Sequence, residues 1–321
     1  MTSNFKNLYT SNNPPLQATL IRGSNIESIH KIHAVISDKK GRVLMCAGNP
    51  EYKSFIRSAL KPFQAIPYVS SGAASKINNP SKSIAIACGS HSGSKLHTRE
   101  AFKILWDYDI DINDLKCPKS KTSPLEHNCS GKHAAFLATC KKFNWPIETY
   151  LKGDHPLQIE IFRIVSELLE IHTSEIKAER DDCGAPTLYL KLLEMSKLYS
   201  LLSSSDNAEL EQISRAMTTN PTLISDNNKF DTEIIKASHG QVIGKGGAEG
   251  IQCLCKINEG IGVALKVEDG SKRAKHAVSL HLLKQLEWIS DLRIQDIEEK
   301  VFNFPEGVRI EVKGQLKFQE S

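Results

Sequence analysis

The sequence predicts an α+β fold, in which strands from the N- and C-terminal parts of the chain form one antiparallel sheet packed with helices. Strand-like segments occur in residues 17–48 and again in residues 240–314. The part between them, approximately 97–240, carries apolar residues at helical spacings. Because the sequence shows no sharp domain boundary, we expect a single domain, 1–321, with this helical part inserted between the terminal strands.

The first part of the chain reads as three strands, residues 17–23, 29–38 and 42–48. Each is rich in β-branched and other apolar residues. The last two are separated by Asp38-Lys39-Lys40-Gly41, a four-residue turn that ends in glycine. They are therefore expected to form a hairpin.

The central part carries helical patterns, in which apolar residues recur every three or four positions. A Ser-rich stretch, 201–210, separates two of these patterns, and a Pro- and Ser-containing loop covers 117–130. The expected helices are residues 97–107, 132–143, 155–171, 187–202, 207–218 and 229–238.

The last part returns to strands at residues 240–247, 251–257 and 260–269, with Asn258-Glu259-Gly260 as a hairpin turn. An apolar stripe at helical spacing follows between Ala274 and Ile289 and is expected to face the core. Residues 308–314 read as a final strand.

Composition excludes several classes of protein. Hydrophobic residues make up 40% and charged residues 24% of the chain, which is typical of globular proteins. The net charge is only +4 and the basic residues are scattered, so nucleic acid is not an expected partner. No apolar run is long enough to span a membrane and residues 1–16 lack the apolar core of a signal peptide, so a cytoplasmic location is expected. The eight cysteines are therefore expected as thiols or metal ligands rather than disulfides.

The first stretch with chemical potential is Ser58-x-x-Lys61. Residues three apart share a face of a helix, so a neutral Lys61 can lie over Ser58 and take its proton. The spacing alone is weak, because serine is followed three positions later by lysine elsewhere too. What distinguishes Ser58 is the apolar helical run that follows at once. The other occurrences begin at Ser3, Ser28, Ser37, Ser92 and Ser174.

Two further stretches are rich in glycine. Ser90 follows an apolar run in Cys88-Gly89-Ser90-His91-Ser92-Gly93, which would otherwise be a simple Ser/Gly turn. Lys245 lies among glycines after a strand, but the complete phosphate-loop pattern is absent. Ser-x-x-Lys, a serine loop and a Lys-Gly strand occur in the order used by penicillin-recognising serine enzymes.

A fourth feature brings together the residue types that zinc prefers. Cys129, Cys183, His127 and His133 can in principle complete a tetrahedral site. The alternative is two buried thiols and two surface histidines. Cys253 and Cys255 alternate with apolar residues on one strand face and are expected in the core.

Six blocks, RSALKP, CGSHSG, HNCSGKHAAFL, DDCGAPT, IGKGGAEG and LKVEDG, resemble in order, and over nearly the whole chain, the rhizobial-type L-asparaginases. The resemblance implies a fold similar to serine β-lactamases and glutaminases. It also implies hydrolysis of L-asparagine to L-aspartate and ammonia by a homodimer, with zinc as a cofactor.

The same resemblance implies the site residues. Asp182 departs from the pattern, because the family usually has glycine before the second zinc cysteine, and this puts the zinc site in question more than catalysis. The implied sets are Ser58 with Lys61 and Ser90 with Lys245 for catalysis; Cys129, Lys132 and Cys183 for zinc; and Arg57, His133 and Asp181 for the substrate.

Our hypothesis from these residues is acyl transfer, in which Ser58 attacks the side-chain amide and water releases aspartate from the acyl-enzyme. Which of the two serines attacks is left open by the sequence. The alternatives are a zinc-dependent amidohydrolase, a β-lactamase-like serine hydrolase acting on another amide, and a non-catalytic amino-acid-binding protein.

Overall fold

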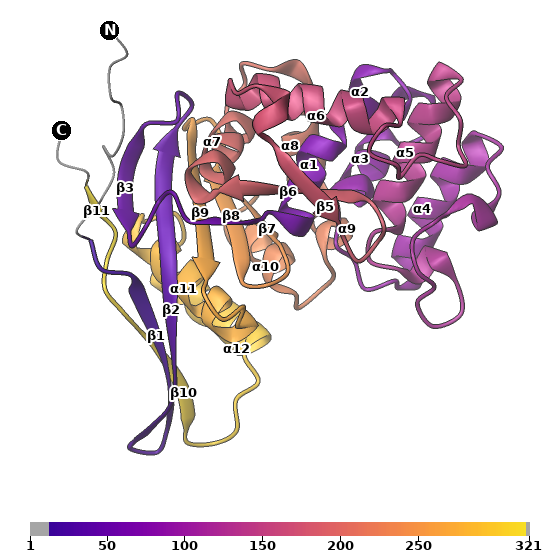
Figure 1. The fold of residues 1–321 in the computed structure, drawn as a ribbon. Coiled ribbons are helices and arrows are strands. Elements are labelled where there is room, and N and C mark those ends of the chain that lie inside the picture. Colours follow the sequence, from indigo (N-terminus) through magenta and orange to yellow (C-terminus); the bar gives the residue numbers. More distant parts are fainter. Residues whose placement is uncertain (1–12, 319–321) are drawn as a thin grey trace, which may run out of the picture.

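The computed structural model describes residues 13–318, and within them eight strands form one antiparallel sheet (Figure 1). Its order is β10-β1-β2-β9-β8-β7, and β3 pairs with both β2 and β11. The two chain ends therefore meet in one sheet, which confirms the predicted fold class. The strands are β1 (Leu16–Arg22), β2 (Asn25–Asp38), β3 (Val43–Ala47), β7 (Val242–Gly246), β8 (Ile251–Lys256), β9 (Ile261–Val267), β10 (Val308–Lys313) and β11 (Lys317–Phe318).

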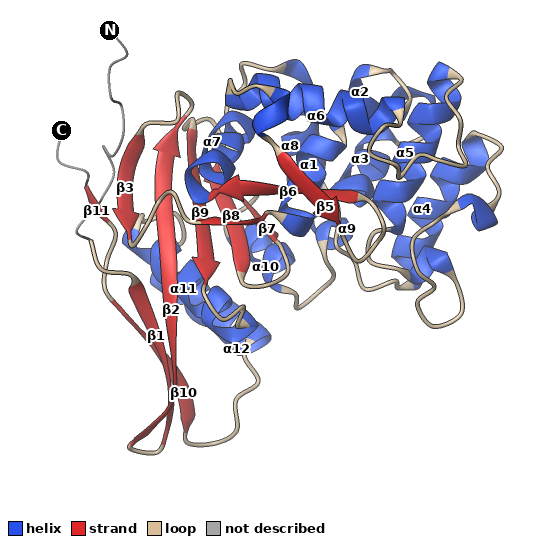
Figure 2. Ribbon diagram, viewed as in Figure 1, coloured by secondary structure: helices blue, strands red, loops and turns tan. Residues whose placement is uncertain are grey.

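The helices gather mainly on one side of this sheet (Figure 2). They are α1 (Lys61–Gln64), α2 (Ile66–Ser70), α3 (Pro80–Cys88), α4 (Lys95–Asp107), α5 (Ser130–Phe143), α6 (Pro156–Leu169), α7 (Leu192–Ser203), α8 (Ala208–Thr219), α9 (Pro221–Ile224), α10 (Phe230–Ala237), α11 (Lys272–Gln285) and α12 (Asp291–Val301). Short 3-10 turns join several of them, among them η1 (Arg57–Leu60) directly before α1.

The sheet separates two hydrophobic cores. Because side chains alternate between the faces of a strand, Ala34 and Ile36 of β2 pack with α11, whereas Val35 between them belongs to the core that includes α7. Cys253 and Cys255 of β8 are fully buried in the second of these cores, as predicted. All eight cysteines lie in the described part of the chain, where they are buried and none is joined in a disulfide, as expected from the sequence.

Most of the predicted elements are present, with ends shifted by a few residues. Both hairpins form, and Gly41 N donates to Asp38 O in the first turn. α12 lies in a segment for which no element was predicted. Among the described residues, no helix is both long and apolar enough to cross a membrane.

One helix prediction, 187–202, is wrong over its first five residues. Residues 186–191 form β6 (Pro186–Lys191), which pairs with β4 (Lys53–Phe55) and β5 (Lys177–Arg180) in a smaller antiparallel sheet. Leu188 and Leu190 are buried and Tyr189 is exposed, so this part follows the two-residue period of a strand. The helix itself, α7, begins only at Leu192.

Candidate active site

A cavity of about 690 Å³ opens where the end of β7 meets the first turns of α10 and α11. Ser58, Ser90 and Asn128 line it together with the glycine-rich segment after Lys245. The remaining lining residues are Ser225, Asn228, Lys229, Phe230, Asp231, Gly246, Gly247, Ala248, Glu249, Gly250, Gly270, Lys272, Arg273, Lys275, His276, Val301, Phe302, Asn303 and Phe304.

The Ser90 hydroxyl is hydrogen-bonded to two buried lysines. Lys245 Nζ lies 2.8 Å and Lys61 Nζ 3.0 Å from Ser90 Oγ. Both lysine side chains are almost completely buried, with exposed fractions of 0% and 1%. The structure therefore brings together three of the four residues expected to be catalytic, around one hydroxyl, and Ser58 lines the same cavity.

Local structure places each of these groups. Ser90 follows the end of α3, where a Cβ on Gly89 would lie 2.3 Å from Leu223 O, so only glycine fits. The Ser90 backbone N–H then donates to Ile224 O at 2.7 Å. Lys245 lies inside β7, opposite Cys253 of β8.

Lys61 makes its hydrogen bonds away from Ser58. Its Nζ donates to Gly89 O at 2.5 Å and to Asn128 O at 3.1 Å, in addition to its contact with Ser90. These three partners occupy all the donors of an ammonium group. This explains why, within residues 13–318, the expected hydrogen bond between Lys61 and Ser58 is not formed.

Ser58 lies beside a strained residue and an unpaired backbone donor. Arg57 has φ of 54°, a left-handed conformation unusual for arginine, and its N–H donates to Thr187 Oγ1. In the described part of the chain, the Ser58 hydroxyl makes no hydrogen bond, and neither the Ser58 N–H nor the Ala248 N–H has an acceptor. An oxyanion at this place would find two free donors.

The electrostatics of the cavity centre on Lys245. Burial lowers its pKa to about 8, while Asp231 acts in the opposite direction and the nearby Lys61 and Lys275 add to the lowering. A lysine with this pKa is partly neutral near pH 8 and can accept a proton.

Asp231 was not singled out from the sequence. Its carboxylate lies 3.8 Å from Lys245 Nζ, and it accepts hydrogen bonds from Gly246 N and Gln252 Nε2, both at 2.9 Å. A carboxylate on the buried face of α10, next to Phe230, was the signal that could have identified it.

Two of the three residues expected to bind substrate are paired with each other. Arg57 Nε donates to Asp181 Oδ1 at 2.8 Å, and Arg57 Nη2 donates to Asp182 Oδ2 at 2.5 Å. Asp182, the residue that departs from the family pattern, is thus a second partner of Arg57. None of these three is among the lining residues of the cavity in the part of the chain that the structure describes.

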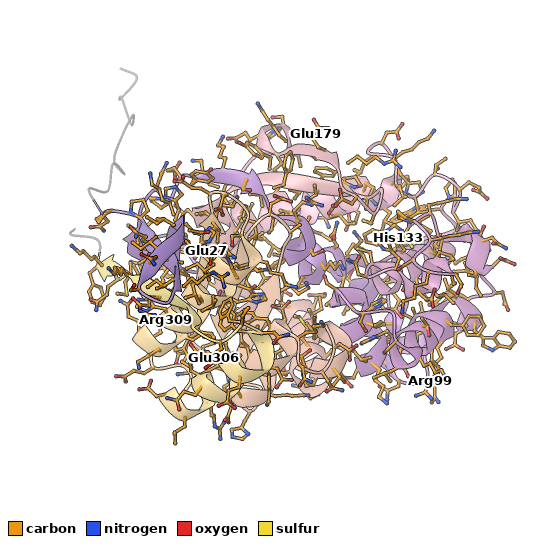
Figure 3. All side chains as sticks on the ribbon, turned by 90° about the horizontal axis from the view of Figure 1, so that it is seen from below. Glu27, Arg99, His133, Glu179, Glu306 and Arg309 are labelled. Carbon is orange, nitrogen blue, oxygen red and sulfur yellow. The ribbon has the colours of Figure 1, made fainter. Side chains whose placement is uncertain are left out.

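The third, His133, is fully buried on α5, among the helices in magenta (Figure 3). Its Nδ1 is 2.7 Å from Tyr150 Oη, and its Nε2 has no hydrogen-bond partner within residues 13–318. Burial lowers its pKa to about 4, so the ring is neutral near pH 7. A buried ring nitrogen without a partner leaves room for a ligand at this point.

The three expected zinc ligands lie close together. Lys132 Nζ is 3.2 Å from Cys183 Sγ. The pKa of Cys129 is well below its ordinary value, first because of its contact with the Cys183 thiol, and also because Lys61 and Lys132 are near. The cluster therefore consists of two thiols beside a buried lysine, next to the serine site, and its contacts favour the ionised form of Cys129.

Cys129, Cys183, His127 and His133 do not form the tetrahedral metal site that their residue types allow. Among the described residues, no three His, Cys, Asp or Glu side chains come together as metal ligands. His127 instead accepts a hydrogen bond from Cys129 N through its Nδ1. Any metal in this cluster would require Lys132 as a ligand beside the two thiols.

Comparison with known proteins gives one match that spans nearly the whole chain and several distant ones. The family model described as L-asparaginase II matches residues 18–318. No curated protein matches the chain.

The solved structures that are similar have low sequence identity. A crystal structure of Mglu in its L-glutamate binding form is 11% identical, covers 80% of this chain and 60% of its own, and has a TM-score of 0.47. A Bacillus glutaminase is 10% identical over 80% of this chain and 91% of its own, with a TM-score of 0.38. A putative beta-lactamase from Bacteroides dorei is 10% identical over 79% of this chain and 85% of its own, with a TM-score of 0.37. This chain thus spans about 60% of the length of the Mglu chain.

The family match covers the segments that carry Ser58, Lys61, Ser90 and Lys245 as well as the thiol cluster. The matched residues include β10 and β7, the first and last strands in the order of the main sheet. This chain belongs to the L-asparaginase II family.

Proposed function

We propose that the protein is an L-asparaginase that hydrolyses L-asparagine to L-aspartate and ammonia by serine–lysine acyl transfer. Membership of the L-asparaginase II family supports amide hydrolysis. The observation that carries the mechanism is the Ser90 hydroxyl, which is hydrogen-bonded to both Lys61 and Lys245 in a cavity shared with Ser58.

In the first step of the proposed reaction, Ser58 Oγ attacks the side-chain amide carbon of asparagine. Its hydroxyl is not committed to another group of the described chain, so it is free to face the substrate. Lys61, three residues later, takes the Ser58 proton through its amine, which must turn toward Ser58 from its contacts with Ser90 and two carbonyls. The C–N bond then breaks, and the acyl group remains on Ser58.

Ser90 and Lys245 supply the proton that the leaving ammonia needs. Ser90 contacts both lysine amines, so a proton can pass from Lys61 through the Ser90 hydroxyl toward Lys245 or the leaving nitrogen. Lys245, with a pKa near 8, can exchange that proton near neutral pH. Water then hydrolyses the acyl-enzyme and releases aspartate.

The negative charge that develops on the amide oxygen is stabilised by backbone donors. Ser58 N–H and Ala248 N–H come from segments far apart in the sequence, both of which line the cavity. Donors of this kind contribute most when they are held in place before the reaction.

Zinc fits the thiol cluster as far as donor chemistry is concerned. Cys129 and Cys183 offer soft thiolates, Lys132 offers an amine, and the unpartnered Nε2 of His133 lies near. When bound, zinc would supply positive charge that keeps the thiols ionised and the Lys132 amine neutral. A zinc ion in this cluster would lie beside Asn128, and we assign it a role in ordering the serine site.

Arg57, His133 and Asp181 remain our candidates for recognition of the amino acid. In the proposed arrangement, Arg57 holds Asp181, and the Asp181 carboxylate contacts the α-ammonium group of the substrate. We also propose, from the resemblance, that the enzyme acts as a homodimer in the cytoplasm. Light scattering on the purified protein tests the dimer.

The experiment that tests the function is ammonia release from L-asparagine and L-glutamine by the purified protein. Ser58→Ala should lose release from asparagine. Ser174→Ala is the matched control, because Ser174 is also followed by lysine three positions later but is exposed at the surface. Absence of release by folded, zinc-loaded wild-type protein would refute the asparaginase proposal.

The same variants separate the serine mechanism from a metal-dependent one. If Ser58→Ala keeps its activity while Cys183→Ala loses it, the nucleophile is not Ser58 and a zinc-dependent amidohydrolase is favoured. If asparagine binds in a calorimeter but no ammonia is released, the protein is a binding protein.

A further inference from the structure

A buried lysine that has no part in the proposed acyl transfer lines the same cavity. Lys275 lies in the first turns of α11, and only 7% of its surface is exposed. Its Nζ donates to Gly247 O at 3.2 Å. In the described part of the chain it forms no ion pair and no second hydrogen bond.

An ammonium group has three donors, so two donors of Lys275 are left without an acceptor. A buried cation with unsatisfied donors is unfavourable unless a partner of opposite charge binds. Burial lowers the pKa of Lys275, and Asp231 acts in the opposite direction. An anion in the cavity would satisfy this group and favour its charged form.

Lys275 lies next to strand β7, which carries Lys245. A Cβ on Gly246 would lie 2.8 Å from Lys275 Nζ, so the ammonium reaches β7 one residue after Lys245. The absence of a side chain at Gly246 makes this approach possible. Lys275 is thus held close to the lysine that contacts Ser90.

The other groups nearby do not neutralise it. Asp231 is committed to Gly246 N and Gln252 Nε2, and Glu249 is exposed at the surface. Arg57, the cation expected to bind the substrate, already pairs with two carboxylates. Lys275 is a buried cation that lines the cavity, and it has no carboxylate partner in residues 13–318.

We propose that Lys275 binds the α-carboxylate of the amino-acid substrate, and of the aspartate product, at the cavity wall beside Ser58 and Ser90. The identity of this carboxylate rests on the proposed function. Asp181 would then receive the α-ammonium group and Lys275 the α-carboxylate, which gives each charged group of the substrate an opposite charge.

The kinetic test compares asparagine with an analogue whose α-carboxylate is replaced by a neutral N-methylamide. Lys275→Met keeps an unbranched side chain and removes the charge. It should raise KM for asparagine about ten- to a hundredfold, the range of a charged hydrogen bond. Because Lys275 also lowers the pKa of Lys245, kcat is compared on the high-pH plateau of each variant, where it should be nearly unchanged. KM for the neutral analogue should be the same in Lys275→Met and wild type.

Two further variants make this result specific. Lys272→Met removes an exposed lysine that lines the same cavity from the same helix, and it should change KM for asparagine less than about twofold. Lys275→Arg keeps the charge and should retain most of the preference for the carboxylate, which covers the case in which Lys275→Met does not fold. Equal changes in KM for both substrates would overturn the proposal.

A binding measurement keeps this inference separate from the proposed function. Calorimetry should show that the wild type binds aspartate at least about tenfold more tightly than β-alanine, which lacks the α-carboxylate, and that Lys275→Met loses this preference. If this holds although no amide is hydrolysed, the asparaginase proposal fails and the carboxylate site stands. If ammonia is released but Lys275→Met keeps the preference for aspartate over β-alanine, the proposed carboxylate site is refuted and the asparaginase proposal is kept.

Discussion

Two buried polar clusters lie on either side of Asn128, and they differ in how far the chain itself satisfies them. Around Ser90, the hydroxyl and both lysine amines have partners, since the hydroxyl contacts the two lysines and Lys61 also donates to Asn128 O. Around Cys183, a thiol and Lys132 lie together, but His133 Nε2 has no partner in the described residues.

This difference indicates which parts of the site are organised before any ligand binds. The serine cluster is held in place by backbone carbonyls and by strand β7, so its geometry does not depend on an added group. The thiol cluster has a thiol whose pKa is lowered by its contacts and a ring nitrogen without a partner in the described residues, which suits a site completed by a bound cation or water. Four predictions test this contrast, from the largest expected effect to the smallest.

Removal of the shared hydroxyl should have the largest effect. Ser90→Ala breaks the contact between the two lysines, so kcat for asparagine should fall about 10²- to 10⁴-fold, as expected for a lost proton-transfer group. The thermal unfolding midpoint should change little. Ser92→Ala, two residues away, is the control. A Ser90→Ala enzyme with wild-type kcat would show that the hydroxyl has no role in proton transfer.

The thiol cluster should depend on metal where the serine cluster does not. Zinc at 100 times its Kd should stabilise the wild type by about 2.7 kcal/mol, seen as a rise of several degrees in the unfolding midpoint. Cys183→Ala should abolish this rise and the zinc content, measured by elemental analysis. Cys140→Ala, a buried thiol elsewhere on α5, should keep both. A zinc-independent midpoint in the wild type would mean that the cluster is complete without metal.

The pH dependence should report on Lys245 in the serine cluster. If the neutral amine is required, kcat rises with pH through about 8, where Lys245 loses its proton. Asp231→Asn removes a negative charge 3.8 Å from Lys245 Nζ, so the ammonium becomes less stable and the pKa falls. The rising limb should move to lower pH by on the order of one unit.

Glu249→Gln is the matched control for this pH profile, because Glu249 is an exposed carboxylate that lines the same cavity. Its profile should be the same as that of the wild type. A limb that moves to higher pH in Asp231→Asn would show that Asp231 does not stabilise the charged form of Lys245.

The smallest effect is expected where the chain departs from the family pattern. The Asp182 side chain is 88% exposed, so Asp182→Asn should lower the free energy of unfolding by only about 0–1 kcal/mol in urea denaturation. Asp181, 13% exposed, holds the same guanidinium, and Asp181→Asn should cost more, about 1.5–3 kcal/mol. Equal costs would mean that exposure does not separate the two carboxylates.

Much of the fold could be predicted because the strands near both ends of the chain are recognisable from their own residues. The apolar and β-branched residues of β2 and the glycine turns on each side of β9 are patterns of residues that are near in sequence. Residues 187–191 were assigned to a helix because apolar residues there fit both periods. Pairing with the neighbouring β5 and with β4, from a distant part of the chain, makes this segment a strand.

The candidate site divides in a similar way. The residue types at Ser58, Lys61, Ser90 and Lys245 could be selected from the sequence, but their partners could not. Lys61 was expected to contact Ser58 because they are three residues apart, whereas its amine contacts Ser90 and two carbonyls. The three-residue spacing of a helical turn is compatible with a contact between them, so the local pattern could not show that groups from distant segments take up the Lys61 donors.

The sequence by itself determined the α+β class, the order of the motifs and the residues with the chemistry for acyl transfer, because these depend on local periodicity and residue type. Only the tertiary structure decided that two lysines meet at Ser90, that Asp231 faces Lys245, and that Asp182 pairs with Arg57. The contacts of Lys245 with Ser90 and of Asp182 with Arg57 join segments more than a hundred residues apart, and the others join separate elements of the fold. Which donors and acceptors meet there depends on packing of the whole chain, and no local pattern records it.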